Sequence, residues 1–128
     1  MNASDNATLS SALVCVNDSH VERYPSEPPF HPDTAYREYR GALGPRNPVY
    51  AAVRDTLRLM KLDPENEETD RWNPLKTVVF PEDRVVLKPN LLSHRHKDRH
   101  GDLECVITHG SVIRAVLDYV MLALKGRG

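Results

Sequence analysis

The sequence predicts an α/β fold: an incomplete three-layer arrangement of a mostly parallel sheet with flanking helices, preceded by a long N-terminal arm rich in proline and aromatic residues. Two features of the chain support this prediction. Residues 84–87 are predicted to form a strand, because the apolar residues 85–87 lead into Lys-Pro-Asn, as is typical of a buried strand. Residues 112–124 have the apolar spacing of an amphipathic helix with a wide buried stripe, and Gly126 follows as a natural C-cap.

Length and charge limit the classes of protein to which the chain can belong. Its 128 residues fit one domain, and a formal net charge of −1 lacks the basic excess of a nucleic-acid binder. No stretch reaches the roughly 20 apolar residues that a membrane span requires. The two cysteines form no CxxC pair and no signal peptide precedes them, so we expect a cytoplasmic protein without an iron–sulfur cluster or another cofactor.

The N-terminal third divides into a tail, a short strand and an arm. Residues 1–11 have the composition of a disordered tail, and residues 12–16 are predicted to form a strand. Residues 20–47, which we call the arm, contain five prolines that forbid a regular helix. Aromatic side chains in the arm favour an extended segment that packs on a core over a disordered one: Tyr24, Phe30, Tyr36 and Tyr39.

A helix is predicted over residues 48–62. Asn47 is a good N-cap and Pro48 suits the first helical position, while Asp63-Pro64 disfavours continuation. One face of this helix is apolar, with Val49, Val53, Leu57 and Met60. The charged residues are expected to point elsewhere: Arg54, Asp55, Arg58 and Lys61.

The C-terminal half is predicted to hold most of the sheet. An acidic loop around Trp72 spans residues 63–76, and short strands are expected at 77–80 and 84–87. Residues 84–126 form a strand–loop–helix unit, in which Arg114 and Asp118 can pair on the exposed edge of the helix. A parallel strand and a helix this apolar need covering layers. We therefore expect residues 12–128 to be the N-terminal portion of a single, truncated α/β domain, whose sheet is completed by missing C-terminal residues or by another chain.

Several short segments of the chain resemble the sequences of a known family. The words VVLKPNLL and ITHGSVIRAVLDYV are similar to the N-terminal part of the family catalogued as domain of unknown function 362. The words YPSEPPFHPDTAYREY, NPVYAAVRDTLRLMKLD and WNPL resemble a branch found among bacterial surface-polysaccharide genes. The resemblance covers most of residues 20–126 and implies an α/β fold in a longer protein. Some relatives carry cysteine clusters for iron–sulfur centres, which this chain lacks.

A candidate anion site lies where the predicted strand ends and the last helix begins. In an open parallel sheet, ligands bind beyond the carboxyl ends of the strands. Lys88 and Asn90 follow the strand, and the free amides of a helix start at Thr108 attract anions. His109 is the best candidate for a catalytic general acid–base. The alternative is that Asn90 is a turn residue, Lys88 reaches solvent and Thr108 is a simple N-cap.

The loop between these elements is rich in histidine and allows three interpretations. It can be a solvated loop, a lid that grips an anion through Arg95, Lys97 and Arg99, or a metal site formed by His94, His96 and His100. The interleaved cations make metal the weakest of the three. Cys105 lies four residues before His109, but its alternation with Leu103 and Ile107 favours a structural cysteine over a nucleophile.

These features predict an enzyme-like domain that binds a phosphorylated or carboxylated small molecule in polysaccharide-related metabolism. One alternative is a non-catalytic assembly or regulatory module that docks through the arm. A second alternative is a metal-dependent enzyme that uses the histidine loop.

Overall fold

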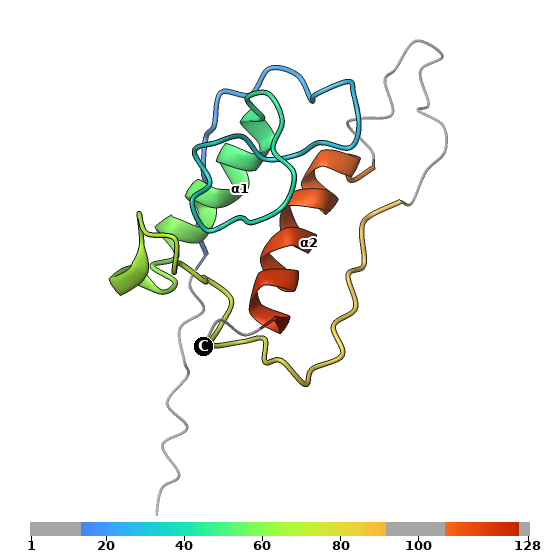
Figure 1. Cartoon of the computed structure of the whole chain (residues 1–128). Coiled ribbons are helices and arrows are strands. Elements are labelled where there is room, and N and C mark those ends of the chain that lie inside the picture. The colour runs from blue at the N-terminus through green and yellow to red at the C-terminus, as the bar shows by residue number, and fades with distance from the viewer. Residues whose placement is uncertain (1–13, 92–106, 126–128) are drawn as a thin grey trace, which may run out of the picture.

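The computed structural model describes residues 14–91 and 107–125. Its regular elements are helix α1 (Pro48–Leu59), the short 3₁₀ helix η1 (Pro64–Asn66) and helix α2 (Gly110–Leu124). Figure 1 shows α1 and α2 side by side, with the arm winding over both of them. The candidate sites described below lie on and between these two helices and the arm.

The predicted α/β fold is wrong for the part of the chain that the structure describes, because none of its residues belongs to a β-strand. Residues 77–78 form a turn, in which the Val78 N–H donates to the Leu75 carbonyl (3.0 Å). Residues 14–16 and 84–87 are irregular or extended without a neighbouring strand. Apolar runs of this kind predict a strand only when a second strand pairs with their backbone, and these two find no such partner here.

Helix α1 begins where the sequence predicted. The side chain of Asn47 accepts a hydrogen bond from the Tyr50 N–H (3.2 Å), and Pro48 occupies the first helical position. The helix ends at Leu59, three residues early, because Lys61 and Asp63 adopt positive φ angles of 52° and 53°. Arg54, which was expected to point away from the apolar face, lies in the interior. It is 7% exposed, because the carboxylate of Glu38 pairs with it in the interior.

Helix α2 confirms the predicted helix, but its buried face is not the apolar stripe that the spacing indicated. The buried residues include Ala115, Tyr119, Val120 and Ala123, whereas Val112, Ile113 and Val116 are only partly buried. Its N-cap is His109 and not Thr108. Leu117 and Met121, which belong to the apolar pattern of the sequence, remain exposed. The described residues therefore cover only part of the apolar surface of α2. None of the helices that the structure describes is both long and apolar enough to cross a membrane.

The core joins four segments that are distant in sequence. Tyr36 comes from the arm, Tyr50 from α1, Trp72 from the following loop, and Ala115 and Tyr119 from α2. Their rings meet edge to face: the centroids of Tyr36 and Tyr50 are 4.7 Å apart, and those of Trp72 and Tyr119 are 5.7 Å apart. Such pairs stabilise a core beyond the area that they bury. The arm therefore supplies part of the core on which the helices pack.

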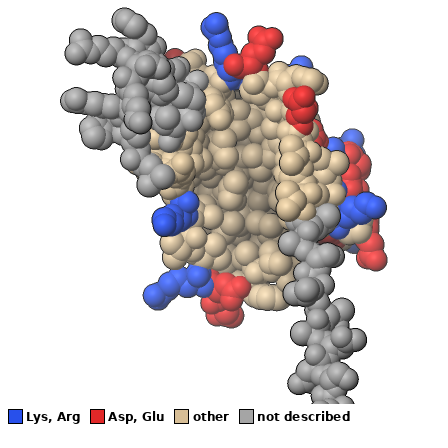
Figure 2. Space-filling view, turned by 180° about the vertical axis from the view of Figure 1, so that it is seen from behind, with Lys and Arg blue, Asp and Glu red and all other residues tan. Residues whose placement is uncertain are grey.

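The face of the molecule turned away from the viewer in Figure 1 has few charged side chains at its centre. Figure 2 shows that charged side chains lie around the rim of this face. Large apolar side chains are exposed at several points of the described chain, including Val14, Val16, Phe80, Val86 and Leu91. The described residues thus leave apolar surface in contact with solvent.

Candidate functional site

The structure brings two of the predicted anion-binding residues together. The Asn90 N–H donates to Thr108 Oγ1 (2.9 Å), and the Thr108 N–H donates to the Asn90 carbonyl (2.7 Å). Lys88 lies two residues earlier on the same extended segment, and its side chain is exposed. The end of this segment and the beginning of α2 are therefore neighbours, as the sequence suggested. Anion binding by these residues stays a prediction.

His109 caps α2. Its Nδ1 accepts a hydrogen bond from the Ser111 N–H (3.2 Å) and lies 2.8 Å from Ser111 Oγ. The imidazole stacks on the ring of Tyr24, with 4.4 Å between centroids, and meets the edge of Phe30 at 5.3 Å. These contacts engage Nδ1 in holding the helix start, so a proton carried by the neutral ring is on Nε2. A role of His109 as a general acid–base stays a prediction.

The histidine loop lies outside the described residues. This applies to the predicted lid residues Arg95, Lys97 and Arg99 and to the alternative metal ligands His94, His96 and His100. Within residues 14–91 and 107–125, no group of three or more His, Cys, Asp or Glu side chains could hold a metal ion. All three interpretations of the loop stay predictions.

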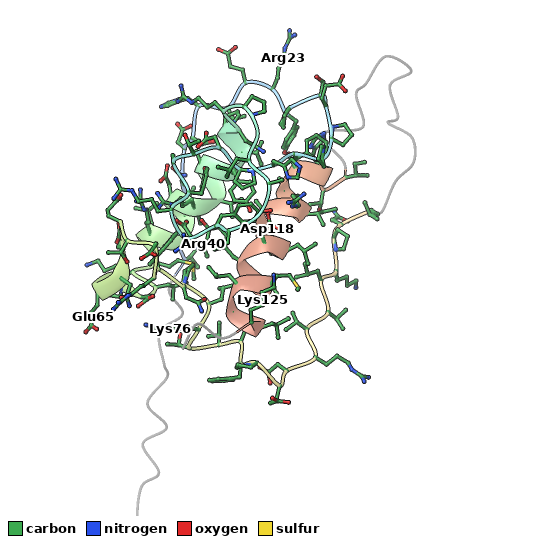
Figure 3. All side chains as sticks on the ribbon, viewed as in Figure 1. Arg23, Arg40, Glu65, Lys76, Asp118 and Lys125 are labelled. Carbon is green, nitrogen blue, oxygen red and sulfur yellow. The ribbon has the colours of Figure 1, made fainter. Side chains whose placement is uncertain are left out.

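A pocket of about 390 Å³ opens between the arm, α1 and α2. This volume lies within the range of small-molecule sites. Much of its wall is aromatic and comes from all three segments: Tyr36, Tyr39, Tyr50 and Tyr119. Figure 3 labels Arg40 of the arm, Asp118 of α2 and Lys125, the C-cap of α2, which contribute charged groups to the lining. The pocket therefore combines ring faces with groups of both charges.

Glu38 forms the most deeply buried charged part of the wall. Its carboxylate accepts from Arg54 Nε (2.9 Å) and Nη2 (3.3 Å), and from the Tyr119 hydroxyl (2.9 Å). The guanidinium of Arg54 is held between the rings of Tyr36 and Trp72, 5.3 and 5.2 Å from their centroids. This pairing and stacking compensates the cost of burying both charges.

Asp118 forms a second paired carboxylate in the wall of the pocket. It accepts hydrogen bonds from Arg114 Nε, at 3.0 and 2.9 Å to its two oxygens, and from the Tyr50 hydroxyl. The structure confirms the predicted Arg114–Asp118 pair but not its place on an exposed edge, since the two side chains are only 22% and 13% exposed. Arg114 also donates to Tyr39 Oη (2.8 Å) and to the Pro29 carbonyl (3.1 Å), so it ties the arm to α2 beside the pocket.

Two phenols of the wall, those of Tyr50 and Tyr119, act as donors and not as bases. Burial, followed by the hydrogen bond to Asp118, raises the pKa of Tyr50 far above its ordinary value. Burial and the charge of Glu38 raise the pKa of Tyr119 in the same way. Both hydroxyls therefore keep their protons and hold the carboxylates in place.

The charges around the pocket leave a positive excess. Glu38 is matched by Arg54, and Asp118 by Arg114. At the rim, Arg40 pairs with Asp70, with 2.5 Å between Nη2 and Oδ2. The exposed ammonium of Lys125 forms no ion pair with the part of the chain that the structure describes. The positive charge of Lys125 would attract a negatively charged ligand to this side of the pocket.

Sequence reasoning missed the pocket. The segments Tyr-Arg-Glu-Tyr at 36–39 and Arg-x-x-x-Asp at 114–118 contribute four of its polar lining residues: Tyr36, Glu38, Tyr39 and Asp118. Nothing local in either segment shows that the two meet, as they do where Arg114 donates to Tyr39 Oη, because this contact depends on how the arm packs.

No family model, curated protein or solved structure matches the chain. The resemblance to domain of unknown function 362 therefore stays a prediction.

Proposed function

We propose that the domain binds a small molecule that carries a phosphate or carboxylate group together with hydroxyl groups, and that the pocket between the arm, α1 and α2 is its site. The observation that carries the proposal is the charge arrangement of this pocket. Each of its two carboxylates is neutralised by an arginine, whereas Lys125 has no ion-pair partner among the residues that the structure describes.

The chemistry of the wall suits a polyhydroxylated guest. Asp118 accepts from Arg114 and from Tyr50 and keeps acceptor capacity beyond these bonds, so it can accept from the hydroxyl groups of a guest. The tyrosine faces offer stacking surface to a sugar ring or a base. Lys125 and Arg40 can form charge-assisted hydrogen bonds with a phosphate. A phosphorylated sugar or a uronic acid unites all three features, in agreement with the predicted role in polysaccharide-related metabolism.

Binding is the part of the proposal that the pocket supports. His109 is not among the residues that line it, so a reaction with His109 as general acid–base rests on the sequence alone. The cytoplasm is the compartment that we propose, since Cys15 is a free thiol and reducing compartments preserve thiols.

Two lysines distinguish the pocket from the predicted site at Asn90 and Thr108. Calorimetric titration with a panel of hexose phosphates and hexuronic acids should reveal a ligand. Lys125→Ala should then weaken binding roughly ten- to hundredfold, because a hydrogen bond to a charged group contributes about 1.5–3 kcal/mol. Lys88→Ala is the matched control, since it removes an equally exposed ammonium from the other site.

The opposite effect of the two substitutions would place the anion site at the start of α2. If Lys88→Ala weakens binding and Lys125→Ala does not, the anion is held at the start of α2 and the pocket assignment is wrong. If none of the compounds binds, the proposal of an anion-binding domain fails.

The alternative of an assembly module that docks through the arm is less favoured. Tyr36 and Glu38 of the arm are buried in the domain's own interior, so this part of the arm is already occupied. The metal-dependent alternative depends on His94, His96 and His100 and is tested by elemental analysis of the purified protein.

A further inference from the structure

Residues 84–91 form an extended segment with two distinct faces. Figure 1 shows it running beside α2 along the outside of the molecule. Val85, Leu87 and Pro89 are half-buried, whereas Arg84, Val86, Lys88 and Asn90 are exposed. This period of two is the geometry of a β-strand, although the segment has no paired strand among the described residues.

The hydrogen bonds of Asn90 distinguish the two edges of this segment. In an extended chain, the N–H and C=O of one residue point to the same edge, and successive residues alternate. Both backbone groups of Asn90 bond to Thr108, so the edge of Val86 and Lys88 is the one that leads toward α2. The other edge carries the backbone groups of Val85 and Leu87. No described residue forms a hydrogen bond with them.

The free edge is a template for another chain. Unpaired N–H and C=O groups on an exposed extended segment pair readily with a second strand. Pro89 limits the pairing on this edge because it has no N–H to donate. The usable length is therefore residues 84–88, followed by the Pro89 carbonyl.

The exposed side chains indicate the charge of the partner. Arg84 and Lys88 flank Val86, which is 81% exposed, and neither cation forms an ion pair with the residues that the structure describes. Side chains directly opposite one another across two strands interact, and opposite charges stabilise the pair. The acidic residues Glu82 and Asp83 precede the segment and lie outside the paired length.

We propose that residues 84–88 bind an extended acidic segment of a partner protein by strand addition. Carboxylates of the partner lie opposite Arg84 and Lys88, and its apolar residues lie opposite Val85 and Leu87. This interaction uses a surface separate from the pocket, so it is independent of the proposed small-molecule binding.

Fluorescence anisotropy with labelled heptapeptides tests the charge preference. The wild-type protein should bind a peptide of alternating valine and glutamate roughly tenfold more tightly than one of alternating valine and lysine, with the difference shrinking at high salt. The double variant Arg84→Glu/Lys88→Glu should reverse the preference. Both positions are exposed, and unchanged helical circular dichroism would verify that the variant folds. Absence of binding by both peptides, or a preference unaffected by the double variant, overturns the proposal.

Backbone methylation tests whether strand addition is the mode of binding. One glutamate peptide is N-methylated at its valine amides and another at its glutamate amides. Because only one edge of the peptide faces the protein, exactly one of these modifications should abolish binding: the valine set for an antiparallel pair and the glutamate set for a parallel one. If both peptides still bind, or neither does, pairing through a single edge is wrong.

Discussion

Arg54 and Glu38 show how a buried charge pair can join the arm to a helix. Burial alone would lower the pKa of Arg54, but the hydrogen bond and the charge of Glu38 outweigh it and raise that pKa. The guanidinium therefore stays charged between the rings of Tyr36 and Trp72. Removal of one partner would leave the other charge in the interior without compensation.

We expect Glu38→Gln to lower the free energy of unfolding by about 3–5 kcal/mol, because it leaves the Arg54 guanidinium buried without a counter-ion. Urea unfolding, followed by the fluorescence of Trp72, measures this loss. Arg40→Ala is the control. It breaks the Arg40–Asp70 pair, whose side chains are 67% and 55% exposed, and should cost at most about 1 kcal/mol. Equal losses in the two variants would contradict the buried pairing.

At the level of secondary structure, the start of α1 has two functions. The Asn47 side-chain oxygen caps the helix, while its Nδ2 donates to the carbonyls of Phe30 (3.1 Å) and His31 (3.3 Å). The same side chain therefore begins the helix and holds the arm over it.

Substitutions of Asn47 can separate these functions. Asn47→Ala should lower the free energy of unfolding by about 2–3 kcal/mol, which combines a lost cap of about 1 kcal/mol with two lost hydrogen bonds to the arm. Asn47→Ser keeps a capping oxygen but has no amide donors, so it should recover only the capping part. Thermal and urea unfolding of both variants measure the difference. If Asn47→Ser is as stable as the wild type, the bonds to the arm contribute nothing.

The helices could be predicted from the sequence because their signals are local. A cap at Asn47, a proline at position 48 and apolar residues repeating along 112–124 act within one turn or one face. The strands could not be predicted reliably, because a strand depends on a partner that the run of residues itself does not specify. Residues 84–91 adopt the extended backbone that their sequence suggests, without the sheet that would make it a strand.

For the molecule as a whole, the pocket depends on contacts between segments far apart in the chain. Glu38 meets Tyr119 across 81 residues, and Tyr50 meets Asp118 across 68. Neither hydrophobic periodicity nor a short sequence motif predicts such long-range pairs. The sequence did indicate neighbours where connectivity requires them, as in the contact between Asn90 and Thr108 on either side of one loop.

Closure of the loop that follows α1 depends on a single carboxylate. Asp63 accepts from the Asn73 N–H (2.9 Å), Asn66 Nδ2 (2.8 Å) and Lys76 Nζ (2.5 Å). Trp72 precedes Asn73 directly, and its indole N–H donates to the Leu62 carbonyl (2.9 Å). The bonds of Asp63 therefore help to keep the only tryptophan of the chain in the core.

The pH dependence of unfolding should reflect this arrangement. Burial alone would raise the pKa of Asp63, but the bonds from Lys76, Asn66 and the Asn73 N–H lower it below its ordinary 3.8. A lowered pKa means that the ionised carboxylate stabilises the fold above about pH 4, and that this contribution is lost as the pH falls through the folded-state pKa. Asp63→Asn should therefore be less stable than the wild type at pH 6. The difference should narrow below pH 3.8, as followed by Trp72 fluorescence during urea unfolding. Asparagine tolerates the positive φ of this position, so backbone strain does not confound the comparison. A constant difference between pH 6 and pH 3 would show that the charge of Asp63 does not stabilise the loop.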